Sequence, residues 1–219
     1  MAKKVLSEQN ILEAARRGDT RISFDENTII TDAARDRAKQ LGIKLEVKDT
    51  KQSVPSVPPT GVSNSKSGEK ELIALGSDHG GFQLKELLIS FLQQAGYKIV
   101  DLGTYNEEAC DYPDFAYAVA RMVSLGEASK GIMIDSVGIA SAMVANKVPN
   151  VRAACCYDEF SARSSREHND ANVLTLGGKV MGVELAKAIT QIWLTTWFGG
   201  GRHQKRVNKI SEVEKRFLK

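Results

Sequence analysis

The sequence predicts an α/β protein with a five-stranded, mostly parallel sheet covered by helices on both faces, preceded by a small N-terminal helical extension. Three observations support this fold class. Short apolar runs of strand length alternate with amphipathic segments of helical period over residues 71–219. Glycines end several of these segments. A stretch rich in Pro and Ser, residues 51–70, separates this part of the chain from residues 1–50.

The main domain, residues 71–219, is expected to alternate strands with helices. ELIALG (71–76) is a short apolar run that ends near a glycine, which predicts the first strand. FQLKELLISFLQQAG (82–96) carries apolar residues at helical spacing and stops at Gly96, which predicts a helix. The other strands are expected at 97–103, 131–135, 151–157 and 171–178. The other helices are expected at 113–126, within 136–147, at 183–198 and from about His203 onward. This alternation implies a sheet with helices on both faces.

The head, residues 1–50, is expected to be a small unit that a linker joins to the main domain. LSEQNILEAARRG (6–18) predicts a short helix whose apolar stripe consists of Ile11, Leu12, Ala14 and Ala15. A second helix is expected to begin after an N-cap at Thr31 and to end at Gly42, followed by a strand, IKLEV. Residues 51–70 hold almost no large apolar side chain, so they are expected to form a flexible, partly extended linker.

Composition narrows the function classes. The 219-residue chain has a net charge of +3 with its basic residues spread out, which argues against a nucleic-acid partner. It has no apolar signal region and no run long enough to span a membrane, so a cytoplasmic location is expected. None of its three cysteines forms a C-x-x-C pair, so no zinc site or redox dithiol is predicted. Cys155 and Cys156 are expected to be small buried residues on opposite faces of a strand.

Polar residues follow the predicted strands. Ligands of parallel sheets bind outside the carboxyl ends of the strands. The loops expected to line a site therefore follow Leu75, Leu102, Ile134, Cys156 and Leu176. Asp78 and His79 lie between glycines after the first strand, although Asp78 could equally be a helix cap. Asp135 ends the third strand, and the small residues after it can point backbone N–H groups at an anion.

Two further polar motifs lie near the C-terminus. His168 and Asn169 precede the fifth strand, where a polar helix end is the simpler interpretation. Arg202 and Arg206 are four residues apart after a run of glycines, so their guanidinium groups could bind a phosphate dianion together. A solvated basic helix is the alternative. All the histidines of the chain fall within these polar motifs: His79, His168 and His203.

Five motifs occur in order: GSDHGGFQLK (76–85), DYPD (111–114), ANKV (145–148), SARSSREHNDANVL (161–174) and GGRHQKRV (200–207). Together they resemble the ribose-5-phosphate isomerase B family, which includes the galactose-6-phosphate isomerase subunits. The resemblance implies a Rossmann-like fold and an aldose–ketose isomerisation that uses no metal or cofactor. It also implies a homodimer or tetramer with active sites at the dimer interface, acting most simply on ribose 5-phosphate to give ribulose 5-phosphate.

The resemblance also implies a role for each matching residue. Asp78 and His79 would contact the open-chain sugar, and the backbone around Gly138 would form an anion hole. His168 would assist ring opening, and Asn169 would hold a hydroxyl group. The phosphate would be bound by Arg202 and Arg206, partly across the subunit boundary, and by Lys179.

The loop after the third strand departs from the family pattern. The family commonly has C-G-T-G-I-G, and this chain has D-S-V-G-I-A over residues 135–140. Asp135 thus replaces the cysteine that moves a proton between C1 and C2, and Val137 replaces a threonine that helps ring opening. Ser141, a predicted substrate contact, stands where other members place a glutamate base. A carboxylate with a raised pKa can serve as this base, so Asp135 is predicted to do so.

These departures leave alternatives open. The substrate could be another aldose phosphate of four to six carbons, or the chain could bind a sugar phosphate with weak or no catalysis. Asp135 could also only cap the following helix. The head, residues 1–50, is similar to segments of bacterial microcompartment enzymes, which implies shell or cargo proteins as its partners. An inert oligomerisation arm is the alternative for the head.

Overall fold

The computed structural model describes residues 5–16, 19–24, 28–47 and 71–217. The chain divides into two compact units, Met1–Glu69 and Lys70–Lys219. This division falls at the end of the predicted linker, 51–70, which lies outside the described residues.

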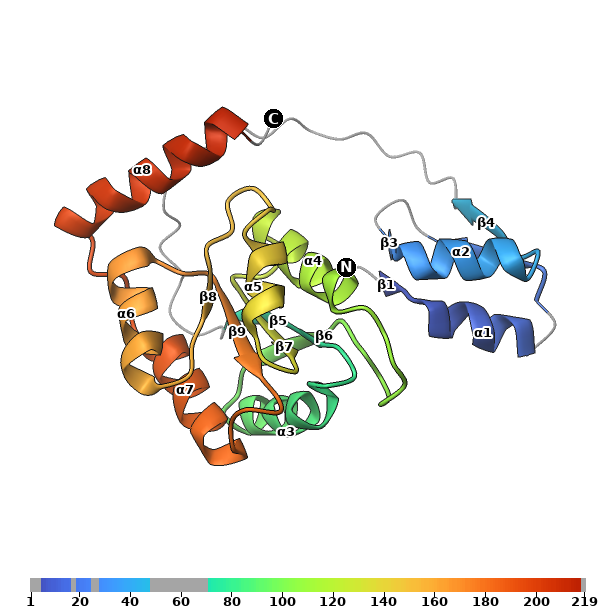
Figure 1. The fold of residues 1–219 in the computed structure, drawn as a ribbon, viewed down its shortest axis with the longest axis horizontal. Helices are drawn as coiled ribbons and strands as arrows, with labels where there is room; N and C mark the ends of the chain where they lie inside the picture. Colours follow the sequence, from blue (N-terminus) through green and yellow to red (C-terminus); the bar gives the residue numbers. More distant parts are fainter. Residues whose placement is uncertain (1–4, 17–18, 25–27, 48–70, 218–219) are drawn as a thin grey trace. The chain divides into compact units, whose positions relative to one another are not determined.

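The main unit is built on a five-stranded sheet in which every neighbouring pair is parallel (Figure 1). The strands lie in the order β6-β5-β7-β9-β8. Their bounds are β5 (Leu72–Ser77), β6 (Lys98–Asp101), β7 (Lys130–Asp135), β8 (Ala153–Cys155) and β9 (Val173–Gly177). The predicted five parallel strands are confirmed, with β6, β8 and β9 shorter than expected. Buried apolar residues continue past the last paired residues of β6 and β8, at Leu102 and Cys156, so an apolar run overestimates the length of a strand.

Helices cover both faces of this sheet (Figure 1). They are α3 (Phe82–Gln94), α4 (Tyr112–Ser124), α5 (Ile139–Ala145), α6 (Glu159–Asn169) and α7 (Val183–Thr195), while α8 (Arg202–Phe217) packs against α6. Helices α4 and α5 pack on one face, where a side chain at Gly131 would collide with Val119 of α4. On the other face, α3, α6 and α7 enclose the main apolar core, which includes Leu88 and Trp193. None of the helices within the described ranges has the length and apolar character of a membrane span.

The strand order creates a switch point between β5 and β7. The chain passes from β5 to β6 on one side, and all later strands are added on the other side. Ser77 at the end of β5 is in register with Ile134, the residue before Asp135. The backbone N–H of Asp78 donates to the Ile134 carbonyl at 3.1 Å. The topology therefore brings Asp78 and Asp135 to the crevice where ligands of such sheets bind.

The head is an α/β unit rather than the helical extension that the sequence predicts. Its elements are β1 (Val5–Leu6), α1 (Glu8–Arg16), β2 (Arg21–Phe24), β3 (Ile29–Ile30), α2 (Asp32–Gln40) and β4 (Lys44–Val47). β1 pairs with β3 and β2 pairs with β4, both in parallel, so two β-α-β halves lie side by side. Only β4 was expected. β1 and β3 are too short for a periodic signal, and β2, which is as long as β4, pairs with residues more than 20 positions away.

The predicted start and end of the second head helix agree with the structure. The hydroxyl of Thr31 accepts a hydrogen bond from the N–H of Ala34 at 3.1 Å, which confirms the N-cap. Gly42 follows α2 with φ of +67°, a conformation that suits glycine at a helix end. Ile11 and Ala14 of the predicted stripe are buried, whereas the Leu12 side chain lies outside the described part of the chain. The local sequence was therefore sufficient to predict helices α1 and α2.

Candidate active site

The turn after β5 holds a buried carboxylate beside an imidazole. Asp78 is 4% exposed, and its Oδ1 accepts a hydrogen bond from the N–H of Gly81 at 3.0 Å. Burial raises the pKa of Asp78, and the negative charge of Asp135 raises this pKa further, against the lowering effect of Gly81 and His79. A side chain at Gly80 would collide with the hydroxyl of Ser136, so the turns after β5 and β7 are in contact.

His79 is oriented by a backbone group from a distant loop. The N–H of Cys110 donates to Nδ1 of His79 at 3.3 Å. A backbone N–H can only donate, so Nδ1 is the acceptor and the proton of the neutral ring lies on Nε2. His79 can therefore offer an N–H donor to a sugar oxygen. Cys110 is 31 positions away, and no local sequence signal indicated this contact.

The carboxylate of Asp135 lies inside a cage of hydrogen-bond donors at the start of α5. Asp135 is 4% exposed. Its Oδ1 accepts from the N–H of Val137 at 2.7 Å and from the N–H of Gly138. Its Oδ2 accepts from the N–H of Ser141 at 3.0 Å and from the Ser141 hydroxyl. Gly138 has φ of +91°, which a side-chain-bearing residue rarely adopts, so this glycine shapes the cage.

The hydrogen bonds of this cage affect the roles that were predicted for Gly138, Ser141 and Asp135. The N–H of Gly138, expected to form an anion hole for the substrate, donates to Asp135 instead. Ser141, expected to contact the substrate, is fully buried and donates both its groups to the same carboxylate. Asp135 thus caps α5, which was the alternative interpretation of this residue. Its role as a proton-transfer base stays a prediction.

Two residues from the end of β8 hold the loop after β7, and the sequence did not indicate either. The carbonyl of Val137 accepts from the hydroxyl of Tyr157 at 2.9 Å and contacts the Cys155 thiol at 3.9 Å. The hydrogen bond with Cys155, followed by burial, raises the pKa of Tyr157 to about 12, so its hydroxyl remains a donor. Cys155 and Cys156 lie on opposite faces as predicted. Only Cys156 is fully buried, because β8 is an edge strand that leaves Cys155 partly exposed.

A second polar group gathers around the end of α6. The rings of His168 and His203 stack with centroids 4.4 Å apart and planes 10° from parallel. Nδ1 of His168 lies 3.1 Å from the hydroxyl of Ser164, and Nε of Arg202 donates to Nε2 of His203 at 3.3 Å. Loss of water contact lowers the pKa of His203, and the nearby charges of His168, Arg202 and Arg206 lower it further. This accumulation of positive charge suits an anion.

The polar groups fall into two clusters at opposite edges of the sheet. β7 and β9 pair from Gly131 with Val173 to Asp135 with Gly177. His168 lies just before β9 begins, and Asp135 lies beside its end, so roughly 13 Å of strand separates the two levels. The carboxyl-edge cluster consists of Asp78, His79, Asp135, Gly138, Ser141 and Lys179. The amino-edge cluster consists of His168, Asn169, Arg202, His203 and Arg206. The predicted strand-end loops therefore collect only the first cluster within one chain.

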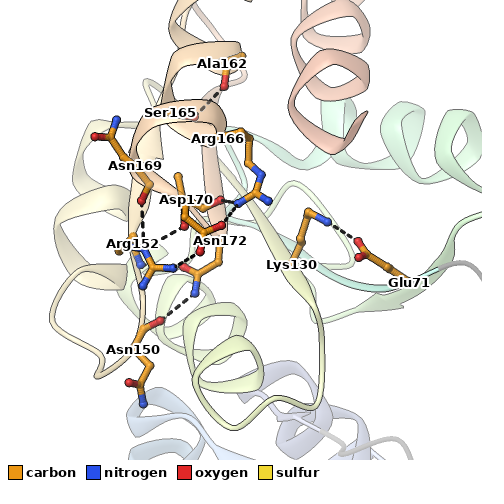
Figure 2. A network of polar contacts seen from close by, with 11 residues as sticks. Glu71, Lys130, Asn150, Arg152, Ala162, Ser165, Arg166, Asn169, Asp170 and Asn172 are labelled. Atoms are coloured by element: carbon orange, nitrogen blue, oxygen red, sulfur yellow. Dashed lines mark hydrogen bonds and ion pairs between the residues drawn. The ribbon is translucent and has the colours of Figure 1, made fainter. Parts of the chain in front are cut away.

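An ion-pair network fixes the backbone beneath the amino-edge cluster (Figure 2). Asp170 has φ of 47°, and its two carboxylate oxygens accept from Arg152 and Arg166, each at 2.9 Å. Arg152 also donates to the carbonyl of Asn169 at 3.1 Å. In Figure 2 the side-chain amide of Asn169 takes no part in this network. The Arg166 and Asp170 pair thus has a structural role, holding His168 and Asn169 at the helix end.

The fold and the switch-point cluster define the chain's main unit as a Rossmann-like α/β enzyme domain. A family model described as Ribose/Galactose Isomerase matches residues 73–210. The chain belongs to this family, and its main unit is an aldose–ketose isomerase domain. The match begins after the head, so residues 1–50 lie outside it.

Similar proteins and solved structures agree with this assignment. The chain is 44% identical over 144 residues to ribose-5-phosphate isomerase B of Escherichia coli (strain K12), covering 66% of this chain and 97% of that protein. It is 40% identical over 144 residues to D-erythrulose-4-phosphate isomerase of Pectobacterium atrosepticum, covering 65% and 94%. A solved structure of Clostridium thermocellum ribose-5-phosphate isomerase B is 49% identical, with a TM-score of 0.66, covering 67% of this chain and 99% of that one.

Proposed function

We propose that this chain interconverts ribose 5-phosphate and ribulose 5-phosphate through an enediolate. The observation that carries the proposal is the buried carboxylate of Asp78, beside an imidazole whose Nδ1 is held by a backbone N–H, at the switch point of the sheet. This arrangement supplies a proton acceptor and a hydrogen-bond donor, which are the two groups that an enediolate mechanism needs. The names of the similar proteins support a sugar phosphate as substrate.

In this proposal the carboxyl-edge cluster performs the proton transfer. The Nε2–H of His79 donates to an oxygen of the open-chain sugar. The base that moves a proton between C1 and C2 is one of two carboxylates at the ends of adjacent strands, Asp78 or Asp135. Lys179 follows β9 at the same edge, is exposed, and can approach a phosphate from solvent. All these groups come from one chain.

The amino-edge cluster is proposed to open the sugar ring and bind the phosphate. His168 would exchange the ring-opening proton, and the side-chain amide of Asn169 would hold a hydroxyl group. Arg202 and Arg206 would bind the phosphate dianion at the start of α8, where loss of water contact and then the nearby positive charges lower the pKa of His203. The two clusters must contact the same substrate molecule if one transfers the proton and the other opens the ring and binds the phosphate.

We infer a homodimer because one chain keeps these clusters at opposite edges of its sheet. A second copy that places its amino-edge cluster against the first copy's carboxyl edge would complete the site. Helix α8 supports this arrangement, since Ile210, Val213 and Phe217 are 47%, 56% and 79% exposed along one side of it. An exposed apolar stripe on a helix beside the cluster suits burial against a partner copy. Pairing of such dimers would give the alternative tetramer.

A second candidate function is isomerisation of another aldose phosphate. The caged Asp135 and the exposed apolar side chain of Val137 stand where the family has a thiol and a hydroxyl, so the sugar's surroundings differ here. A relative named D-erythrulose-4-phosphate isomerase supports a shorter sugar as the alternative. A sugar-phosphate-binding scaffold without catalysis is the third candidate, favoured by the complete hydrogen-bonding of Asp135.

A panel of four- to six-carbon aldose phosphates assayed for ketose formation separates these candidates. The main proposal expects the largest kcat/KM for ribose 5-phosphate. A larger value for a tetrose or hexose phosphate would shift the function to that sugar. Measurable binding without turnover of any sugar in the panel would favour the scaffold.

For the head we propose a role in targeting the enzyme to a bacterial microcompartment, through shell or cargo proteins. The head folds as its own compact unit with its own small core of Ile11, Ala34, Ala38 and Ile43, which suits a separable interaction domain. Deleting residues 1–68 should leave isomerase activity intact and abolish co-assembly with shell or cargo proteins. Undiminished co-assembly of the shortened chain would contradict this role.

A further inference from the structure

We infer that Asp78 is the base that moves the proton between C1 and C2, and that Asp135 is a fixed negative charge that tunes it. This assignment rests on the proposed isomerase function and decides between its two candidate carboxylates. It reverses the expectation from the sequence, which placed the base at the position of the missing cysteine. The assignment rests on a comparison of the hydrogen bonds that the Asp135 and Asp78 carboxylates accept.

Asp135 has no acceptor site left for a proton from carbon. An ionised carboxylate offers about four lone-pair sites. Three backbone N–H groups and one hydroxyl, from Val137, Gly138 and Ser141, fill these sites within the described structure. A C–H proton could reach Asp135 only after one of these buried donors had broken its bond. That donor would then lose its hydrogen-bond partner, which costs free energy.

Asp78 is equally buried but less fully bonded. Among the described residues, its side chain receives hydrogen bonds from the backbone N–H groups of Gly81, at 3.0 Å, and of Gly80. About two of its lone-pair sites therefore remain for a substrate proton. Its position after β5, next to His79, puts it at the switch-point crevice. The geometry thus gives one of the two carboxylates the freedom that a base requires.

The proposed step balances without a co-reactant. Asp78 takes the proton from C2 of the open-chain aldose, and the C2–H electron pair forms the C1=C2 bond. The carbonyl electron pair moves onto O1, which accepts a hydrogen bond from Nε2–H of His79. Asp78 then returns the proton to C1, while the O2 hydroxyl proton passes to O1 and leaves the C2 carbonyl of the ketose.

Asp135 would act on this base through its charge. The groups that interact with Asp78 are His79 on its own turn, Cys110 on the loop before α4 and Asp135 at the end of β7. Burial raises the pKa of Asp78 most, and the charge of Asp135 raises this pKa further, which makes Asp78 a better proton acceptor at neutral pH. The donor cage keeps that neighbouring charge fixed in place. Asp135 is therefore a positioning and tuning residue in this assignment.

The test compares two isosteric variants, Asp78→Asn and Asp135→Asn, in the full-length chain. Proton transfer is read directly as deuterium incorporation into the sugar phosphate in D2O, using the best substrate of the panel. Asp78→Asn keeps the oxygen that Gly81 binds and is expected to slow exchange about 10²- to 10⁴-fold. Asp135→Asn is expected to lose less and to move the acid limb of the kcat–pH profile to lower pH. The shift follows because removing a like charge lowers the pKa of Asp78.

Asp135→Asn could perturb the loop itself, so a second measurement uses small carboxylates. Formate or acetate should restore exchange to Asp78→Gly and should not restore it to Asp135→Gly. Exchange in Asp78→Asn within about tenfold of wild type, or rescue of Asp135→Gly alone, would overturn the assignment while leaving the isomerase function in place. A wild-type chain that exchanges no proton on any sugar phosphate would overturn the function and the assignment together.

Discussion

The carboxyl-edge and amino-edge clusters differ in how far their side chains are buried and hydrogen-bonded within one chain. At the carboxyl edge, Asp78 and Asp135 are buried, and four donors surround Asp135. At the amino edge, His168 is half-buried and Arg202 is exposed, and their contacts are a stacked ring and single hydrogen bonds. The hydrogen bonds of Arg152 and Arg166 to Asp170 hold the backbone beneath the second cluster.

This difference shows which half of the site is preorganised by its own chain. A reacting centre must be held by buried, mutually supporting groups, which describes the carboxyl edge. Phosphate binding tolerates exposed side chains, because their charges act over longer distances and can be ordered by the ligand. The amino edge thus has the character of a surface that is completed by another molecule.

The largest expected difference between the edges is in stability. Asp135→Asn puts an amide NH2 against donors that need an acceptor, so it should lower the free energy of unfolding by about 1–3 kcal/mol. Arg202→Ala at the amino edge should change it by no more than about 0.5 kcal/mol. Urea unfolding followed by circular dichroism measures both. Equal losses would mean that the two edges are equally preorganised.

A smaller contrast is expected in substrate affinity. Removing one charge-assisted hydrogen bond to phosphate, by Arg202→Ala, should raise KM about 10-fold or more with a smaller change in kcat. Lys209→Ala is the matched control, since it removes an exposed positive charge from the same helix outside the cluster. Steady-state kinetics on the best substrate gives the comparison. Similar KM values for the two variants would remove Arg202 from the phosphate site.

The smallest predicted effect is a titration shift at His203. Its pKa is lowered in the free protein by burial and nearby positive charge. A bound phosphate dianion favours the charged imidazole, so inorganic phosphate should raise this pKa and widen the pH range in which His203 is protonated. NMR titration of the histidine ring, with sodium chloride at equal ionic strength as control, measures the change. An identical curve in both salts would place the anion elsewhere.

Much of the fold followed from local sequence. Helical periodicity located α3, α4 and α7, and short apolar runs located the strands, because burial on both faces of a parallel sheet demands them. The cap at Thr31 was readable for the same local reason. The small strands of the head were not, since two-residue pairings such as β1 with β3 depend on distant partners. Pairing of this kind leaves no periodic signal.

The site was predictable as a set of residues but not as an arrangement. Motifs identified Asp78, His79 and His168, and their order along the chain already put His168 before a strand and the other two after one, but it did not show that His168 stacks on His203. Nor could sequence show that Gly138 and Ser141 would bind Asp135 rather than a substrate, since this depends on the backbone path of one turn. The Cys110 contact that fixes the tautomer of His79 is equally non-local.

The central claim is that the carboxyl-edge cluster of one copy acts with the amino-edge cluster of another. Asp78→Asn and His168→Ala chains, each nearly inactive alone, can be co-expressed with different tags and purified as a mixed dimer. If the site is shared, the mixed dimer holds one intact site and should recover about half of the wild-type activity per dimer. If each chain carries a complete site, both sites in the mixed dimer are defective, and activity no higher than that of the parent variants would contradict the account.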